Sequence, residues 1–246
     1  MALTAAPEDQ ALLLDLQELD TRLQQLAHKA ASLPEIAEIA RLEAEAAELR
    51  RTATARTGEL EDARAELGRV EADVAVVTAR VERDRGRLDH AATAKDAQAL
   101  EQELAALAKR TSDLEDIQLA VMETVEEREA ALAETTDALA GVDERIAVAV
   151  AARDAALAEL EGERTHVAAN RATVAGKVPA DLLALYERQR ERYGVGASLL
   201  RGGVTGATGV ALTASDLATV RAAAPDAVLI CPDSNAVLVR TAESGL

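Results

Sequence analysis

Few residues in this sequence have the chemistry needed for nucleophilic catalysis or metal binding. The single cysteine is Cys231, and Ser234 follows it three residues later. A serine or cysteine nucleophile needs a base and an orienting group close by, and no histidine follows residue 166. His28, His90 and His166 lie instead along the predicted coiled coil, where we expect partly exposed side chains. The sequence therefore predicts no catalytic residues.

A glycine-rich stretch at residues 202–206 (GGVTG) superficially resembles a phosphate-binding loop. It lacks the Gly-Lys-Ser/Thr ending with which a P-loop holds phosphates and Mg²⁺. The carboxylates are numerous but are spread along predicted helix surfaces, where they are usually solvated or paired with Lys and Arg. We therefore expect no cofactor and no enzymatic activity.

The composition favours long helices over a thick globular core. The chain has 246 residues, no Phe or Trp, and two tyrosines, Tyr186 and Tyr193. A compact core of this size normally draws much of its buried area from aromatic side chains. Here the core has to be built from Ala, Leu, Val and Ile, which suits the seams between helices.

Charge, hydropathy and cysteine content argue against several classes of protein. The net charge is −17, and the first 200 residues carry −16 of it, which disfavours nucleic acid as a partner because phosphates are bound by Lys and Arg. No run approaches the ~18 apolar residues of a membrane span, and residues 1–10 lack the basic start of a signal peptide. A single cysteine excludes a disulfide scaffold. We expect a soluble, cytoplasmic protein that does not bind a membrane.

Apolar residues recur at alternating spacings of four and three along most of the chain. One such seam runs from Leu12 to Leu33 and is interrupted by Pro34, where we expect a kink or a break. It restarts at Ile39, and 13 of its 15 positions up to Leu88 are apolar. A further seam of 22 positions, 15 of them apolar, runs from 100 to 174. A sustained repeat of this period predicts a left-handed coiled coil.

The seams are separated by a predicted turn at residues 89–94. Thr93 and Asp96 have the spacing of a capping box, which places a helix start near residue 94. The segments 8–88 and 94–174 are equally long, which favours an antiparallel hairpin within one chain over residues 8–176. A parallel dimer of two chains without a reversal near residue 91 is the alternative, so the chain is a monomer or a homodimer.

Residues 177–246 are expected to form a small α+β lobe. A short helix opens at Pro179 and ends near Gly194, and Thr213 and Asp216 mark a second one over 214–223. Residues 228–230 and 237–239 read as strands on either side of a turn. The expected core is aliphatic and comprises Val204, Val210, Leu212, Leu217, Val220, Val228, Leu229, Ile230, Val237 and Val239.

Seven short stretches carry a resemblance to a known family. They are Leu16–Asp20, Leu33–Pro34, Ala99–Leu104, Asp113–Asp116, Leu185–Glu187, Cys231–Pro232 and Val237–Arg240. In this order they resemble bacterial proteins with an N-terminal coiled-coil hairpin and a C-terminal four-cysteine zinc ribbon. The resemblance implies a mainly α fold, a long antiparallel coiled-coil hairpin with a small zinc-ribbon-like lobe.

The expected zinc ligands are depleted. The family's two knuckles each have the form Cys-x2-Cys, whereas the corresponding positions here are Thr205, Thr208, Cys231 and Ser234. A structural zinc needs four nitrogen or sulfur donors, and hydroxyls are poor substitutes. We therefore expect a lobe without metal, held by its aliphatic core and by docking on the helix over 179–193.

These features favour a protein-interaction scaffold with a protein partner that the sequence does not identify. The resemblance implies partners such as an alternative sigma factor or flagellar-assembly proteins. Expected contact surfaces are the hairpin tip at His90–Asp96, the leucines beside the seams and the glycine-rich loop. The alternative is an RNA- or DNA-binding protein that acts through the C-terminal ribbon.

Overall fold

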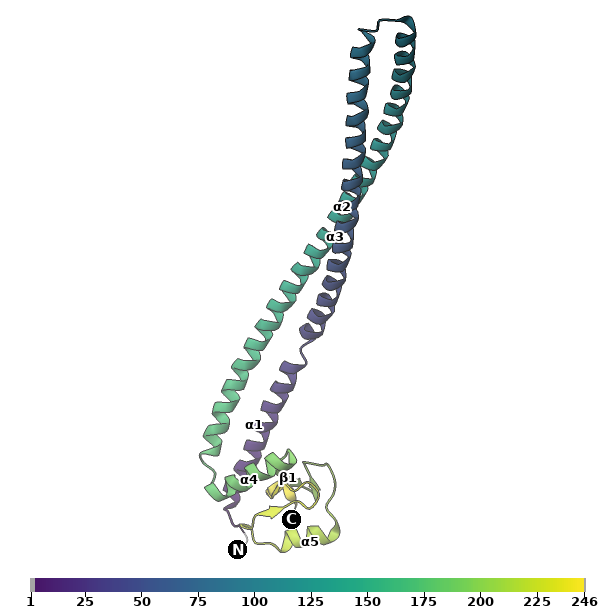
Figure 1. Cartoon of the computed structure of the whole chain (residues 1–246). Coiled ribbons are helices and arrows are strands. Elements are labelled where there is room, and N and C mark those ends of the chain that lie inside the picture. Colours follow the sequence, from purple (N-terminus) through teal and green to yellow (C-terminus); the bar gives the residue numbers. More distant parts are fainter. Residues whose placement is uncertain (1–2, 246) are drawn as a thin grey trace. The chain divides into compact units, whose positions relative to one another are not determined.

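The computed structural model describes residues 3–245, which form a helical hairpin followed by a small lobe (Figure 1). The hairpin helices are α1 (Pro7–Ala31), α2 (Pro34–Leu88) and α3 (Ala94–Ala175). The remaining elements are α4 (Ala180–Tyr193), β1 (Ala197–Arg201), β2 (Val204–Thr205), α5 (Ala214–Ala222), β3 (Leu229–Ile230), β4 (Val237–Val239) and the 3₁₀ helix η1 (Ala242–Ser244).

The chain divides into two compact units. The hairpin unit comprises Glu35–Ala151, that is, α2 and the first part of α3. The lobe unit comprises the chain up to Pro34 together with everything from Ala152 onward. It therefore contains α1, the last part of α3 and the lobe itself.

In the hairpin unit the two helices run antiparallel, joined by the turn at residues 89–93 (Figure 1). Arg50 pairs with Asp143 at 2.8 Å, and Glu59 pairs with Arg128 at 2.8 Å, so residue numbers rise on one helix as they fall on the other. Every predicted seam position from Ile39 to Leu88 is buried or half-buried. The prediction of an antiparallel coiled-coil hairpin within one chain is confirmed.

Both predicted interruptions of the hairpin have clear local causes. At the first, α1 ends at Ala31 and α2 begins at Pro34, whose missing N–H costs nothing in the first turn of a helix. At the second, Thr93 Oγ1 accepts a hydrogen bond from the Asp96 backbone N–H at 3.2 Å. The Asp96 carboxylate accepts from the Thr93 hydroxyl at 2.7 Å, whereas a full capping box would bring it to the Thr93 N–H. Aspartate is one methylene shorter than the glutamate of a full box, so only half of the box forms.

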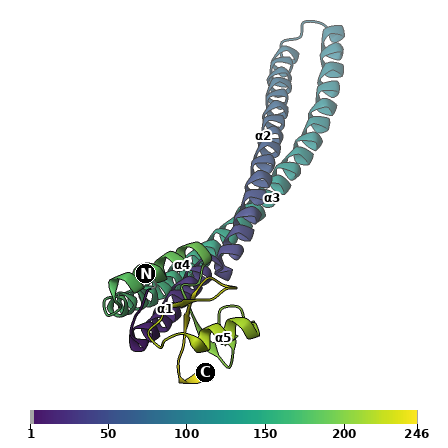
Figure 2. The ribbon, with the colours of Figure 1, turned by 90° about the horizontal axis from the view of Figure 1, so that it is seen from below.

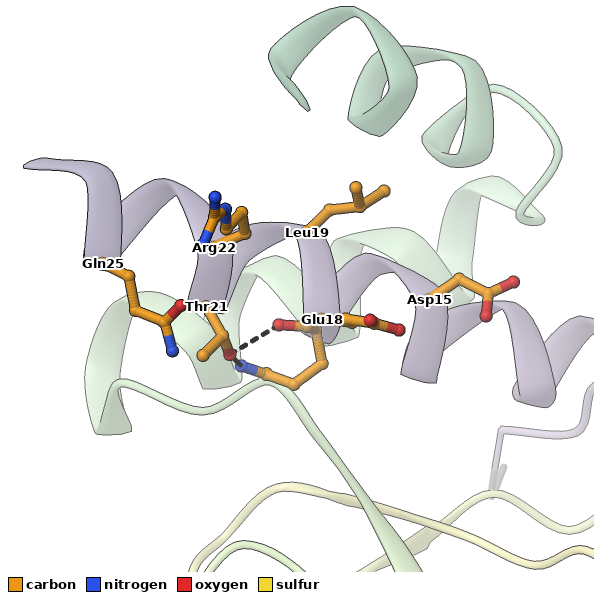
Figure 3. Close-up of a pocket in the computed structure, with 7 residues that line it drawn as sticks. Asp15, Glu18, Leu19, Thr21, Arg22 and Gln25 are labelled. Atoms are coloured by element: carbon orange, nitrogen blue, oxygen red, sulfur yellow. Dashed lines mark hydrogen bonds between the residues drawn. The ribbon is translucent and has the colours of Figure 1, made fainter. Parts of the chain in front are cut away.

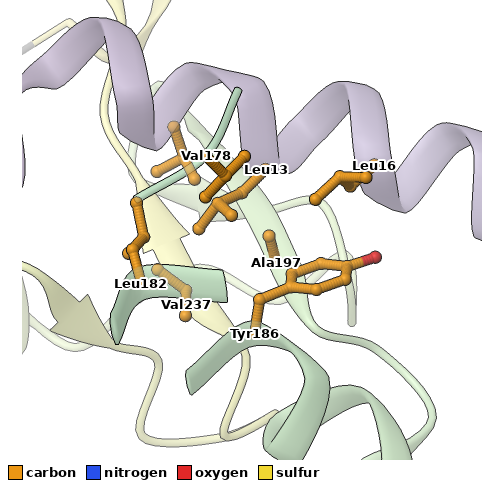
Figure 4. Close-up of a cluster of buried hydrophobic side chains, with 8 residues drawn as sticks. Leu13, Leu16, Val178, Leu182, Tyr186, Ala197 and Val237 are labelled. Atoms are coloured by element: carbon orange, nitrogen blue, oxygen red, sulfur yellow. The ribbon is translucent and has the colours of Figure 1, made fainter. Parts of the chain in front are cut away.

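The lobe is a three-layer arrangement around a four-stranded sheet of order β2-β1-β4-β3. The central pair, β1 and β4, is parallel, and both outer pairs are antiparallel. On one face, Ala197, Val237 and Val239 pack with residues of α1 and α4 (Figures 2 and 4). On the other face, Leu200 and Leu238 pack with Val220 of α5.

The structure corrects the expected lobe core. Val204, Val210 and Ile230 are exposed, with 39, 52 and 39% of their surface accessible. Val204 and Ile230 lie on the short outer strands, and Val210 lies in a loop, so none of the three is enclosed by the sheet layers. Their place is taken by Leu200, Leu238 and Tyr186, which are fully buried.

Candidate functional site

The two turns that correspond to the zinc knuckles lie at the same end of the sheet. After β2, the Gly206 N–H donates to the Leu199 carbonyl of β1 at 2.9 Å. Between β3 and β4, the Cys231 N–H donates to the Ala236 carbonyl at 2.8 Å, just before Val237 pairs with Ala197. Both turns therefore lie beside the first residues of β1, Ala197–Leu199.

The side chains at the four ligand positions do not suit zinc. Thr205 is fully buried, and its hydroxyl shares a 2.7 Å hydrogen bond with that of Thr208. Ser234 Oγ accepts from the Ala236 N–H at 3.4 Å, which leaves Cys231 as the one thiol in the set. A tetrahedral zinc site needs four nitrogen or sulfur donors, so this donor set does not fit the metal.

Cys231 belongs to the lobe core. Its side chain is fully buried in the cluster of Leu200, Leu212, Val220 and Leu238. The three histidines are exposed on the hairpin helices or the turn. Within residues 3–245 there is no group of three or more His, Cys, Asp or Glu side chains that could hold a metal ion.

Two of the three arginines after residue 200 are engaged within the lobe. Arg201 Nε donates to Glu243 at 2.9 Å. The Arg240 guanidinium lies at the C-terminal end of α5 and donates to a fan of backbone carbonyls there, at distances between 2.6 and 3.4 Å. These carbonyls belong to Val220, Ala223, Ala224, Pro225 and Ala227.

A buried network fastens α4 to the hairpin helices of the lobe unit. Asp20 of α1 is 3% exposed and accepts from the Tyr186 hydroxyl at 2.7 Å and from Arg171 Nε at 2.6 Å. Arg190 Nε lies 3.4 Å from the same carboxylate, and Arg171 also donates to Glu187 at 2.6 Å. One carboxylate thus joins α1, α3 and α4.

The electrostatics of this network favour an ionised Asp20. Burial by itself would raise the pKa of the carboxyl group. Hydrogen bonds from Arg171 and Tyr186, together with the charges of Arg171 and Arg190, outweigh burial and hold the pKa of Asp20 below its usual value. Burial and the bond to Asp20 raise the pKa of Tyr186, so its hydroxyl stays a donor.

Sequence reasoning missed this network, although two of the family-like stretches contain its members. Asp20 ends the stretch Leu16–Asp20, and Tyr186 and Glu187 belong to Leu185–Glu187. The available signal was an acidic residue directly after the seam residue Leu19. Its partners lie more than 150 residues away in the sequence, which is why spacing alone could not pair them.

A second contact, also missed, fixes the start of the sheet on α1. Gln17 Oε1 accepts from the backbone N–H groups of Gly196 at 2.7 Å and Ala197 at 3.3 Å. A Cβ on Gly196 would lie 2.5 Å from the Tyr186 ring, so this position requires glycine. The lobe therefore docks on α1 as well as on the predicted helix α4.

Next to the Gln17 contact, the exposed side of α1 carries an open, shallow groove of about 780 Å³. In Figure 3, Leu19 and Arg22 project from one side of the helix and Thr21 and Gln25 from the other. Among the described residues, Glu18 and Gln25 form no hydrogen bond or ion pair with another side chain, so their polar groups are available. The groove is lined by Asp15, Gln17, Glu18, Leu19, Thr21, Arg22 and Gln25.

Two of the predicted contact surfaces, the hairpin turn and the glycine-rich loop, have locally determined conformations. At the hairpin turn, His90 Nδ1 donates to the Gly86 carbonyl at 2.9 Å, and Thr93 caps α3. In the glycine-rich loop, Gly202 and Gly203 adopt positive φ values of 56° and 80°, which allow the tight reversal between β1 and β2.

Comparisons with known proteins agree with this architecture. The sequence matches the family model described as "CT398-like coiled coil hairpin domain" over residues 16–194. The chain belongs to the CT398-like coiled coil hairpin family. The match covers α4 and most of the hairpin, including Asp20, Arg171 and Tyr186.

Relatives of this CT398-like protein extend the likeness to the lobe. It is 35% identical over 237 residues to the uncharacterised proteins Rv2229c and MT2288 of two Mycobacterium tuberculosis strains, covering 96% of this chain and 97% of theirs. A solved structure from Mycobacterium smegmatis is 34% identical, with a TM-score of 0.88 over 97% of this chain and all of that one.

More distant structures share the fold alone. CT398 of Chlamydia trachomatis is 17% identical, with a TM-score of 0.67 over 95% of this chain and 98% of its own.

None of the helices formed by residues 3–245 is long and apolar enough to cross a membrane.

Proposed function

We propose that this CT398-like protein is a non-enzymatic interaction scaffold whose protein partner binds in the α1 groove. The observation that carries the proposal is the asymmetry of α1. One side is immobilised by Asp20, Leu13 and Leu16, whereas the exposed side presents the open groove, in which Glu18 and Gln25 have no side-chain partner among the described residues. Because α1 is held in place on one side, its groove of polar side chains and Leu19 is a preorganised surface. Preorganisation lowers the entropic cost of association.

The state of the reactive side chains supports a non-enzymatic role. The Cys231 thiol is enclosed by aliphatic side chains, and the Thr205 and Thr208 hydroxyls bond to each other. A catalytic nucleophile has to reach both its base and a substrate. These residues instead serve the packing of the lobe.

The use of the lobe arginines favours a protein partner over nucleic acid. Arg201 and Arg240 are engaged by Glu243 and by backbone carbonyls, which leaves Arg221 as the remaining cation after residue 200. Phosphate binding requires several available cations. A salt-dependent shift of labelled RNA by low concentrations of the protein would favour the nucleic-acid alternative instead.

Site-specific cross-linking tests the groove. A photoreactive residue at Gln25 is expected to form an adduct with a discrete protein in the native cell. The second-site variant Glu18→Arg should abolish the adduct, because it reverses a charge within the groove. Glu8→Arg, an exposed change on the same helix outside the groove, should leave it intact. The proposal would be overturned if no adduct formed, or if the adduct still formed in the Glu18→Arg variant.

Point variants are needed because removing the lobe would expose Leu13 and Leu16.

A further inference from the structure

The hairpin unit carries a second surface, independent of the α1 groove, on one side of its coiled coil. Leu119 and Met122 are large apolar residues of α3, yet 60 and 41% of their surfaces are exposed. They continue a stripe with alternating spacings of four and three, which places its members on one side of the helix. The stripe, here called the Leu119 face, comprises Ala108, Ser112, Glu115, Leu119, Met122 and Glu126.

At one end the Leu119 face opens into a groove between α2 and α3. The groove has a volume of about 370 Å³, and its apolar lining includes Val81, Leu104 and Ala108. Glu115 and Ser112 belong both to the groove and to the stripe, so the two form one continuous surface. From residue 108 to residue 126 it extends about 27 Å along the helix, the length of some five turns.

The pairing of the two helices shows what faces this stripe from α2. Arg64 of α2 forms an ion pair with Glu129 of α3 on this side. Glu71 lies one heptad after Arg64 on α2, and Met122 lies one heptad before Glu129 on the antiparallel α3. Glu71 and Met122 are therefore opposite each other. Thr78 and Glu115, one heptad further, both line the groove. Beyond the Arg64–Glu129 pair, the next two positions therefore have no cation.

Negative charge predominates on this side, because Arg85, the cation in the groove lining, forms an ion pair with Glu82. Among residues 3–245, Glu71, Glu115 and Glu126 form no ion pair, although all three are exposed. The surroundings add to this charge: residues 108–137 contain nine acidic residues and three basic ones, Lys109, Arg110 and Arg128. Such a field attracts cations and repels nucleic acids, anionic membranes and other copies of this acidic chain.

We propose that the Leu119 face binds a basic amphipathic helix of another protein. The apolar side of that helix would cover Leu119, Met122 and the groove, and its flanking Lys or Arg residues would pair with Glu71, Glu115 and Glu126. Laying an amphipathic helix into an apolar groove is a recurrent mode of peptide recognition. The charge complementarity selects a basic helix and gives it a fast, salt-dependent association.

The test uses the full chain and a synthetic helix of about 20 residues in which Leu occupies the heptad seam and Lys flanks it. Binding is followed by fluorescence anisotropy. The double variant Leu119→Ser with Met122→Ser is expected to weaken binding about tenfold or more, whereas Ile117→Ser should change it less than about twofold. Ile117 is a matched control because it is 44% exposed on the same helix but points away from the stripe.

A second pair of variants tests the charges. Glu115→Gln with Glu126→Gln should weaken binding and flatten its dependence on salt, because two carboxylates no longer attract the lysines. A peptide with Glu in place of Lys should bind far more weakly than the basic one. Both outcomes together would assign recognition to apolar and charged groups of the same face.

Three results would overturn the proposal. The basic peptide could fail to bind, or it could bind the Leu119→Ser/Met122→Ser variant as tightly as the wild type. Alternatively, sedimentation could show that the wild type is a dimer and this variant a monomer, which would make the face an interface between copies. None of these results bears on the α1 groove, so the proposed function would be judged separately by cross-linking.

Discussion

Asp20 is the residue on which the attachment of α4 to the hairpin helices of the lobe unit most depends. Its buried carboxylate accepts hydrogen bonds from Tyr186 and Arg171 and lies 3.4 Å from Arg190. Replacing Asp20 by Asn removes the buried carboxylate of this network and leaves Glu187 as the one carboxylate paired with the half-buried Arg171 and Arg190. We expect a loss of about 3 kcal/mol in the free energy of unfolding, as for other broken buried ion pairs. Urea denaturation at pH 7 measures it, with Asp15→Asn, an exposed carboxylate on the same helix, as the control.

The same residue predicts how stability depends on pH. Because the pKa of Asp20 is lower in the folded protein than its ordinary value of 3.8, its stabilisation is complete above that value. The stabilisation is lost as the pH falls from about 4 through the lower, folded-state pKa. The free energy of unfolding, measured by denaturation at several pH values between about 2 and 5, should therefore change less with pH for Asp20→Asn than for the wild type. Parallel curves for the two proteins would contradict the assigned role.

Gly196 makes a steric prediction next to this network. In Gly196→Ala the new Cβ would lie 2.5 Å from the Tyr186 ring, which is enclosed on all sides. We expect a destabilisation of about 1–3 kcal/mol, typical of overpacked cores. Gly162→Ala, in α3 of the same unit, meets nothing within 4 Å and should instead stabilise by up to about 1 kcal/mol. Thermal unfolding of the two variants should shift in opposite directions; shifts of the same sign would contradict the close approach.

At the scale of elements, Arg240 holds the C-terminal end of α5 in place within the lobe. Its guanidinium donates to carbonyls at and beyond the C-terminus of α5, which satisfies backbone groups that a helix end leaves unpaired. Lysine keeps the charge but lacks the planar fork that reaches several acceptors. We expect Arg240→Lys to cost about 1–3 kcal/mol and to speed hydrogen exchange in α5. Arg221→Lys, a change in the last turn of the same helix, is the control, and equal effects of the two variants would contradict this role.

The helices could be predicted from the sequence because their signals are local. The seam from Ile39 to Leu88 repeats with the period of a coiled coil, and Pro34 and Thr93 mark helix starts with their own side chains or backbone. Strand β1 could not be predicted in this way. Its sequence, ASLLR, contains no β-branched residue and becomes a strand because β4 and β2 pair with it from either side.

The candidate sites also differ in whether the sequence contains a signal for them. The four ribbon positions Thr205, Thr208, Cys231 and Ser234 were assigned from the resemblance to the zinc-ribbon family, and they lie in two local turns of the chain. The Asp20 network and the α1 groove depend instead on which helices meet after folding. Contacts such as that of Asp20 with Tyr186, which are 166 residues apart, leave no mark in local periodicity.

At the scale of the whole molecule, the two units differ in how completely they exclude water. Of the twelve largest fully buried side chains in the described part of the chain, eleven belong to the lobe unit and one, Leu42, to the hairpin unit. The seam of the hairpin unit is otherwise made mainly of half-buried residues such as Val74 and Val77. Because apolar burial provides most of the stabilisation, the two units should open with different free energies.

Hydrogen exchange measures this difference directly. Amides of β1, β4 and α4 should exchange only by unfolding of the lobe unit, whereas those of α2 and α3 between Val70 and Leu114 should exchange earlier, through openings of lower free energy. Leu42→Ala should speed exchange in the hairpin unit by removing its one large, fully buried side chain, and Leu200→Ala should do so in the lobe. If either variant accelerated hydrogen exchange equally in both units, the chain would unfold as a single cooperative unit. The Leu119 face would then open with the same free energy as the lobe unit.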